Sequence, residues 1–187
     1  MSNLEEYSNK IHEEVTAVLS RVDPEQVQSA LELIQKARKI AFYGAGREGL
    51  MMRALAMRLF HMGYDVSVVG DMTAPFLTNG DLLILSVGSG YISTGDALRS
   101  VAQRDGATVL CLTAQPHGKT PAAADKIVYL PAQTMADDTG GKATSILPMG
   151  SVNELVLFVF GEILVLELLK RTGKTFGEAR DRRTNLE

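Results

Sequence analysis

Residues 39–49 read Lys-Ile-Ala-Phe-Tyr-Gly-Ala-Gly-Arg-Glu-Gly, an apolar run that passes into a glycine turn and then into a helical pattern. A second apolar run ends in the glycine segment Ser86–Tyr91, and a third glycine segment, Pro148–Glu154, opens the longest apolar helix. In an open α/β sheet, the loops at the carboxyl ends of the strands meet at the crevice that binds ligands. Helix N-termini add backbone N–H groups there. The three segments therefore predict a small-molecule site.

The wider pattern predicts the fold class. Two amphipathic helical segments come first, and short apolar runs then alternate with helix-length stretches. Such runs are typical of parallel strands buried on both faces. We therefore expect a doubly wound, three-layer αβα sandwich around a five-stranded parallel sheet. The expected strands are 39–43, 65–69, 82–86, 108–112 and 127–130.

Composition limits the class of protein. A chain of 187 residues, 45% hydrophobic and 22% charged, suits one domain spanning 1–187, with N-terminal helices in 3–37 and a C-terminal tail at 174–187. The net charge of -3 provides no basic surface for nucleic acid or anionic membranes. Glu162 and Glu167 interrupt the longest apolar stretch, which argues against a membrane span. The polar N-terminus is no signal peptide, so we expect a cytoplasmic protein.

Two further segments carry expectations about assembly and access. The helical stretches 50–62 and 152–170 are apolar on nearly every side, which indicates a subunit interface or, alternatively, deep burial under the first two helices. The polar segment 132–142 is expected to form a mobile loop over the site. The single cysteine, Cys111, lies in an apolar run, excludes an internal disulfide and is expected to be a core thiol.

The first glycine segment also fits a dinucleotide site. Gly44, Gly46 and Gly49 satisfy the G-x-G-x-x-G pattern after a strand, and Asp71 stands where a ribose-binding acid is expected. Against this hypothesis, the chain has no second domain to hold a substrate and the residues for hydride transfer.

Five parts of the chain resemble the sugar isomerase (SIS) domain family, and within it the 6-phospho-3-hexuloisomerases. The resemblance implies a flavodoxin-like sandwich that forms homotetramers, with sites built between subunits. It also implies a sugar or sugar-phosphate substrate whose carbonyl moves along the chain through an enediol, without a cofactor or metal. The parts are Phe42–Gly49, Ala56–Gly63, Asp81–Gly90, Pro148–Ser151 with Glu154, and Thr184–Glu187.

The same resemblance assigns roles to residues. Glu154 matches the family's catalytic glutamate, and a carboxylate suits the proton transfer between neighbouring carbons that an enediol requires; a plain helix-terminal charge is the alternative. His61 matches a family histidine, for which a structural hydrogen-bonding role is equally open. The expected substrate-binding residues are Gly44, Gly46, Arg47, Glu48, Ser86, Ser89, Tyr91, Ser93, Thr94 and Arg183.

This chain also departs from the family pattern. The family commonly carries Ser at positions 48 and 87, Glu-Thr at 91–92 and His at 183, where this chain has Glu48, Val87, Tyr91-Ile92 and Arg183. The resemblance associates 48, 87 and 92 with the substrate phosphate. Three hypotheses remain: a hexulose-phosphate isomerase, an isomerase of a sugar without phosphate at the usual place, and a non-catalytic sugar-binding module.

Overall fold

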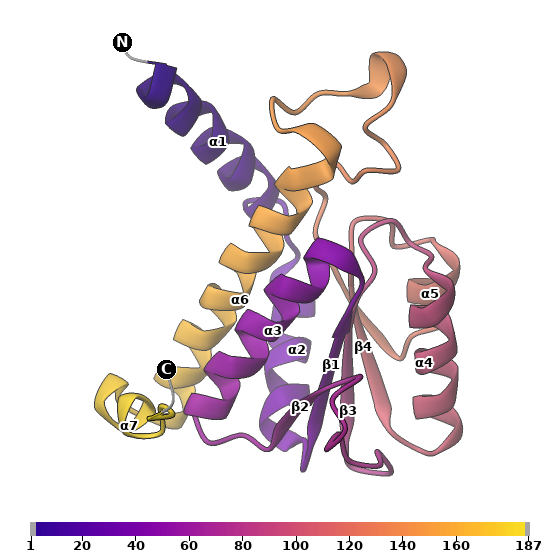
Figure 1. The fold of residues 1–187 in the computed structure, drawn as a ribbon, viewed down its shortest axis with the longest axis vertical. Coiled ribbons are helices and arrows are strands. Elements are labelled where there is room, and N and C mark those ends of the chain that lie inside the picture. Colours follow the sequence, from indigo (N-terminus) through magenta and orange to yellow (C-terminus); the bar gives the residue numbers. More distant parts are fainter. Residues whose placement is uncertain (1–2, 186–187) are drawn as a thin grey trace.

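The computed structural model describes residues 3–185, and it contains a parallel sheet between layers of helices (Figure 1). The strand order is β2-β1-β3-β4-β5, and every neighbouring pair is parallel. This confirms the expected αβα sandwich, and each observed strand end lies within one residue of its expected position. The strands are β1 Ile40–Gly44, β2 Val66–Val68, β3 Leu82–Ser86, β4 Thr108–Thr113 and β5 Lys126–Tyr129.

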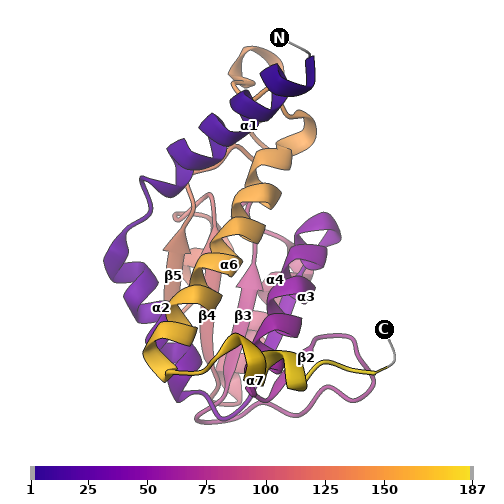
Figure 2. The same ribbon diagram turned by 90° about the vertical axis from the view of Figure 1, so that its left-hand side faces the viewer.

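Helices cover both faces of the sheet (Figures 1 and 2). On one face lie α2 Pro24–Lys36, α3 Gly46–His61 and α6 Ser151–Thr172; on the other lie α4 Ser93–Arg104 and the short α5 Lys119–Ala122. α1 Asn3–Leu19 packs on α6 and projects from the body, and α7 Phe176–Asp181 follows α6. Two single 3₁₀ turns, Gly140–Lys142 and Pro148–Gly150, precede α6.

The strands divide their side chains between two cores. Alternate residues of a strand point to opposite faces, so Leu82 and Ile84 of β3 pack under α2, α3 and α6, whereas Leu83 and Leu85 pack under α4. Cys111 of β4 is fully buried in the α4-side core, as expected from the sequence. The continuous apolar runs therefore reflect strands that are covered on both sides.

Part of the apolar surface of α3 and α6 stays exposed. Leu50, Met57 and Phe60 on α3 and Phe158 and Leu166 on α6 are each more than two-fifths exposed. The other sides of these helices are buried against the sheet and against each other. Among residues 3–185, no helix has the length and apolarity needed to cross a membrane.

Candidate active site

The two central strands define a crevice at their carboxyl ends. β1 and β3 are neighbours, with Gly44 opposite Ser86, but β1 leads into α3 on one face and β3 leads into α4 on the other. Ligands of open α/β sheets bind where the strand order reverses in this way. The first two glycine segments meet at this point, as the sequence predicts.

Tight packing explains the glycines of the first segment. A Cβ at Gly49 would lie 2.5 Å from the Gly44 carbonyl oxygen, and a Cβ at Gly44 would lie 2.9 Å from the Gly49 nitrogen. Gly46 adopts a positive φ of 56°. Asp71 pairs with Arg53 at 3.7 Å, and both side chains are about half exposed. The glycines of the dinucleotide pattern are thus explained by the close approach of α3 to β1.

Glu48, in the first turn of α3, points into the crevice between the two glycine loops. Its Oε2 accepts hydrogen bonds from Ser86 Oγ at 2.5 Å and from Gly88 N at 3.1 Å. Asn153 Nδ2 of α6 approaches Oε1 at 3.4 Å. Burial raises the pKa of Glu48 above its ordinary value, the charge of Glu154 adds to this, and the two hydrogen bonds oppose it.

Glu154 lies in the first turn of α6, and its side chain is 16% exposed. Arg47 Nη1 stands 2.7 Å from Glu154 Oε2 and also donates a hydrogen bond to Ser151 Oγ at 2.7 Å. The guanidinium and the carboxylate are thus in direct ion-pair contact. Among the described residues, this ion pair is the polar contact of the buried Oε2. Arg47 therefore holds the Glu154 carboxylate between the starts of α3 and α6.

The third glycine segment fixes where α6 begins. Gly150 has a φ of 72°, and a Cβ there would lie 2.3 Å from the Met135 nitrogen. Met149 also has a positive φ, 58°, and its N–H donates to Asp138 Oδ2. The segment 132–142 is thus attached to the start of α6, one turn before Glu154. Its expected mobility stays a prediction.

The loop between β3 and α4 is divided between core and crevice. Val87 is fully buried and Ile92 is partly buried in the α4-side core. These two departures from the family therefore contribute to packing. Four predicted substrate-binding residues are instead exposed near the N-terminus of α4, namely Ser89, Tyr91, Ser93 and Thr94.

His61 and Arg183 lie together, but away from the crevice. They line a cavity of about 400 Å³ at the far end of α3, which Arg58, Glu162 and Arg180 also line. Arg47 and His61 are about 21 Å apart along α3, at about 1.5 Å for each of fourteen steps. Within one chain, His61 and Arg183 are thus not beside Glu154.

The tail that carries Arg183 packs back on α3. Lys174 Nζ donates to the Met62 carbonyl, and a Cβ at Gly63 would lie 3.0 Å from the Arg182 guanidinium carbon. Thr175 and Glu178 form a capping box that starts α7. The last two residues of the family-like ending, Leu186 and Glu187, lie outside the described residues.

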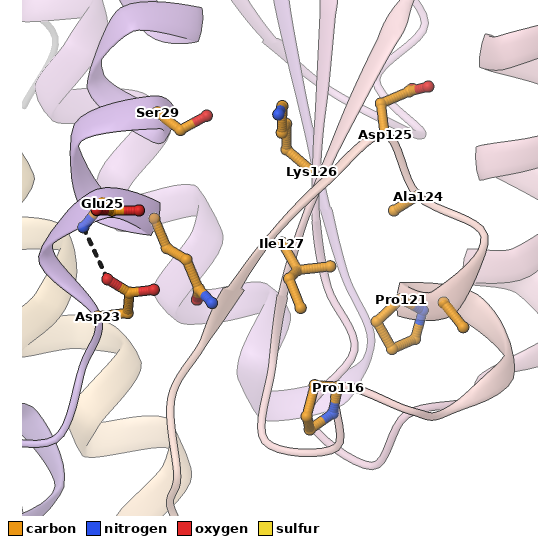
Figure 3. A pocket seen from close by; sticks show the side chains of 11 residues that line it. Asp23, Glu25, Ser29, Pro116, Pro121, Ala124, Asp125, Lys126 and Ile127 are labelled. Atoms are coloured by element: carbon orange, nitrogen blue, oxygen red, sulfur yellow. Dashed lines mark hydrogen bonds between the residues drawn. The ribbon is translucent and has the colours of Figure 1, made fainter.

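A cavity of about 490 Å³ lies elsewhere, between α2 and the segment from Pro116 to Ile127 (Figure 3). It lies at the β5 edge of the sheet, on the far side of β4 from the switch between β1 and β3. The Asp23 side chain at its rim accepts a hydrogen bond from Glu25 N and so caps α2. We place the site at the crevice because the glycine loops, the Arg47–Glu154 ion pair and the hydrogen-bonded Glu48 carboxyl group meet there.

Sequence reasoning missed Ser151 and Asn153, which join the site through Arg47 and Glu48. Their proximity to Glu154 in the first turn of α6 was the available signal. No group of three or more His, Cys, Asp or Glu side chains within the described part of the chain could hold a metal ion.

Comparisons with known proteins agree with this architecture. A model of the SIS domain family matches residues 33–158. A 3-hexulose-6-phosphate isomerase of Mycobacterium gastri is 36% identical over 177 residues, which cover 95% of this chain and 88% of the relative. One from Bacillus subtilis is 32% identical over 168 residues, 90% of each chain. A solved structure of a hypothetical protein from Methanococcus jannaschii, inferred to be a 3-hexulose-6-phosphate isomerase, has a TM-score of 0.82 and 28% identity, with 100% of both chains covered.

Proposed function

Because the chain belongs to the SIS domain family, we propose that it is a cofactor-independent sugar isomerase of the 3-hexulose-6-phosphate isomerase type. Such a reaction moves the C3 carbonyl to a neighbouring carbon through an enediol. It requires one group that takes a proton from carbon and returns it to the adjacent carbon.

The observation that carries this proposal is the position of Glu154, which is mostly buried in the first turn of α6 and is held by Arg47 of α3 beside the crevice. We assign Glu154 as the base. Arg47 holds the Glu154 carboxylate at the start of α6 through the ion pair. A non-catalytic sugar-binding module would gain nothing from a mostly buried carboxylate at this place, because removing a charged group from water is costly.

We further propose a homotetramer in which subunits share sites. The exposed apolar surface of α3 and α6 supports an interface. A neighbouring subunit would bring the His61 and Arg183 end of its α3 to the crevice, which lacks these residues within one chain. His61 would then assist proton transfer and Arg183 would contact the substrate. The cytoplasmic location expected from the sequence belongs to this proposal.

A second candidate is an isomerase of a sugar without phosphate at the usual place. Glu48 favours it, because its carboxylate already occupies the Ser86 hydroxyl and the Gly88 N–H that an anion would otherwise use. A carboxylate about 4 Å from a phosphate adds a repulsion of roughly 4 kcal/mol per unit charge at an effective dielectric near 20. Ser89, Ser93, Thr94 and the N-terminus of α4 still offer groups for a phosphate farther along the loop.

The test is an assay of 3-hexulose 6-phosphate and of the free 3-hexulose in D₂O, with thermal melting in each ligand. The proposal expects conversion of the phosphate ester and deuterium at the exchanging carbon. Saturation at about 100 times Kd should add roughly 2.7 kcal/mol to stability. Conversion of the free sugar alone would favour the second candidate. Absence of exchange and of isomerisation with both sugars would contradict both isomerase proposals.

A further inference from the structure

The crevice contains two carboxyl groups, but only one of them has a nearby cation. Glu154 pairs with Arg47, whereas no ion pair joins Glu48 to a lysine, arginine or histidine among residues 3–185. Arg47, its neighbour in sequence, turns to α6 instead. The two carboxyl groups thus have opposite electrostatic environments at one site.

The two oxygens of Glu48 also differ. Oε2 is held by the Ser86 hydroxyl and the Gly88 N–H, which fix the side chain on β3 and its loop. Within residues 3–185, the hydrogen-bond contact of Oε1 is the 3.4 Å approach of Asn153 Nδ2. A carboxyl group anchored through one oxygen leaves the other to exchange a proton with a ligand.

We propose that Glu48 is a second catalytic residue, which moves a proton between the two oxygen atoms of the enediol while Glu154 moves a proton between its two carbon atoms. This inference rests on the proposed isomerase function. It goes beyond the family resemblance, which places a serine at position 48 and gives it a phosphate-binding role.

The proton count balances over the reaction. Glu154 takes the C2 proton as Oε1–H of Glu48 protonates the C3 carbonyl oxygen, which gives a neutral enediol. Glu48 then takes the proton of the C2 hydroxyl while Glu154 returns its proton to C3. The carbonyl now stands at C2, Glu48 is again protonated and Glu154 is again a carboxylate. No oxidant or cofactor takes part.

The surroundings of Glu48 favour the neutral acid that this role needs. Burial raises its pKa, and the charge of Glu154 on α6 raises it further. On β4, Cys111 is buried and its thiol is neutral, because its pKa is raised to about 12. Carboxyl pairs whose environments drive their pKa values apart divide acid and base roles in this way.

The experiment compares Glu48→Gln and Glu48→Ser with the wild type on 3-hexulose 6-phosphate, across pH and in D₂O. Gln keeps an oxygen for Ser86 and Gly88 but carries no transferable proton. We expect kcat to fall by about 10²-fold in both variants. The high-pH limb of the wild-type profile, where Glu48 loses its proton, should disappear. Deuterium in recovered substrate should rise relative to product, because the enediol returns more often.

Matched controls separate this role from a structural or specificity role. Glu32→Gln removes an exposed carboxylate on α2 and should leave the profile unchanged. The inference would be overturned if the Glu48 variants kept the wild-type kcat and pH profile. A change confined to KM for the phosphate ester would overturn it as well. In that case the proposed isomerase function would still stand, provided that Glu154→Gln abolished turnover. An inactive wild type would overturn the proposed function, and the role of Glu48 with it.

Discussion

The two ends of α3 differ in charge. At its N-terminal end lie Glu48 and Glu154, and the one nearby cation, Arg47, pairs with Glu154. At its C-terminal end, the cavity around His61 is lined by Arg58, Arg180 and Arg183, with Glu162 as its acidic residue. The first end holds carboxyl groups, and the second holds three arginines. Under the proposed function, a complete site for a sugar phosphate uses both ends, and these lie about 21 Å apart in one chain.

The surface between these ends is apolar. Leu50, Met57 and Phe60 extend along α3, and Phe158 and Leu166 of the adjacent α6 are also exposed. A second copy packed against this surface would bury it at a gain of about 25 cal/mol per Å². Such an interface would allow opposite ends of α3 from two subunits to meet.

The largest expected effect comes from the N-terminal end. Glu154→Gln should lower kcat by about 10²–10⁴-fold, because the amide cannot take a proton from carbon. Deuterium incorporation into recovered substrate, followed by NMR, measures this step directly. Glu167→Gln, farther along the same helix, is the control. Deuterium exchange as fast as in the wild type would remove Glu154 from the base role.

The second prediction concerns the C-terminal end. A chain truncated after Ala179 loses Arg180 and Arg183 but keeps Lys174 and its contact with Met62. It should stay folded by circular dichroism and lose activity. The truncated chain and the Glu154→Gln variant can be refolded together in equal amounts. If each site takes one end of α3 from each of two subunits, random mixing should restore about a quarter of the wild-type activity. A mixture that exchanges subunits and stays inactive would place both ends outside a shared site.

A third prediction tests the surface between the ends. Leu50→Glu places a charge on the exposed α3 surface and should shift the proposed tetramer to smaller species at micromolar concentration, because burying an unpaired charge is costly. Activity should fall with it. Val101→Glu on α4, where Val101 is similarly exposed, is the control. Sedimentation velocity reports the outcome, and a wild-type monomer would contradict the prediction at once.

The smallest expected effect concerns stability. A raised pKa means that the folded state binds the Glu48 proton more tightly than the unfolded state does. Stability from this group is present below its ordinary pKa of 4.5 and is lost as pH rises through the raised value. Glu48→Gln should therefore gain stability relative to the wild type as pH rises from 4.5 through the raised pKa. Urea midpoints across this range provide the measurement; parallel curves would contradict the raised pKa.

The fold could be predicted from the sequence because its signals are local. Continuous apolar runs mark strands covered on both faces, and each run formed a strand with small changes at its ends. The glycine segments indicated the crevice because they directly follow strands in the sequence.

The side-chain contacts within the site could not be predicted from the sequence. Arg47 binds Glu154 and not its neighbour Glu48, because the start of α6 lies beside the start of α3 only in three dimensions.

Positions inferred from the family pattern alone were also ambiguous. Val87 and Ile92 suggested lost phosphate ligands, but both side chains contribute to the α4-side core. Side chains of a strand alternate between its two faces, but those of a loop do not. The sequence therefore does not reveal whether a loop side chain points to the core or to the crevice. His61 and Arg183 line one cavity, but Glu154 does not, because it lies near the other end of α3.

Cys111 makes the protein convenient to study by chemical labelling. It is the only cysteine in the chain, and burial raises the pKa of its thiol to about 12, with a further contribution from the charge of Glu48. Maleimide reagents, which attack thiolates, will therefore pass over the native residue and label cysteines introduced at the surface. Fluorophores on α3 and α7 can then test for subunit exchange, and Cys111 need not be replaced first. In denaturant, the rate at which Cys111 itself is modified reports the rate at which the α4-side core opens.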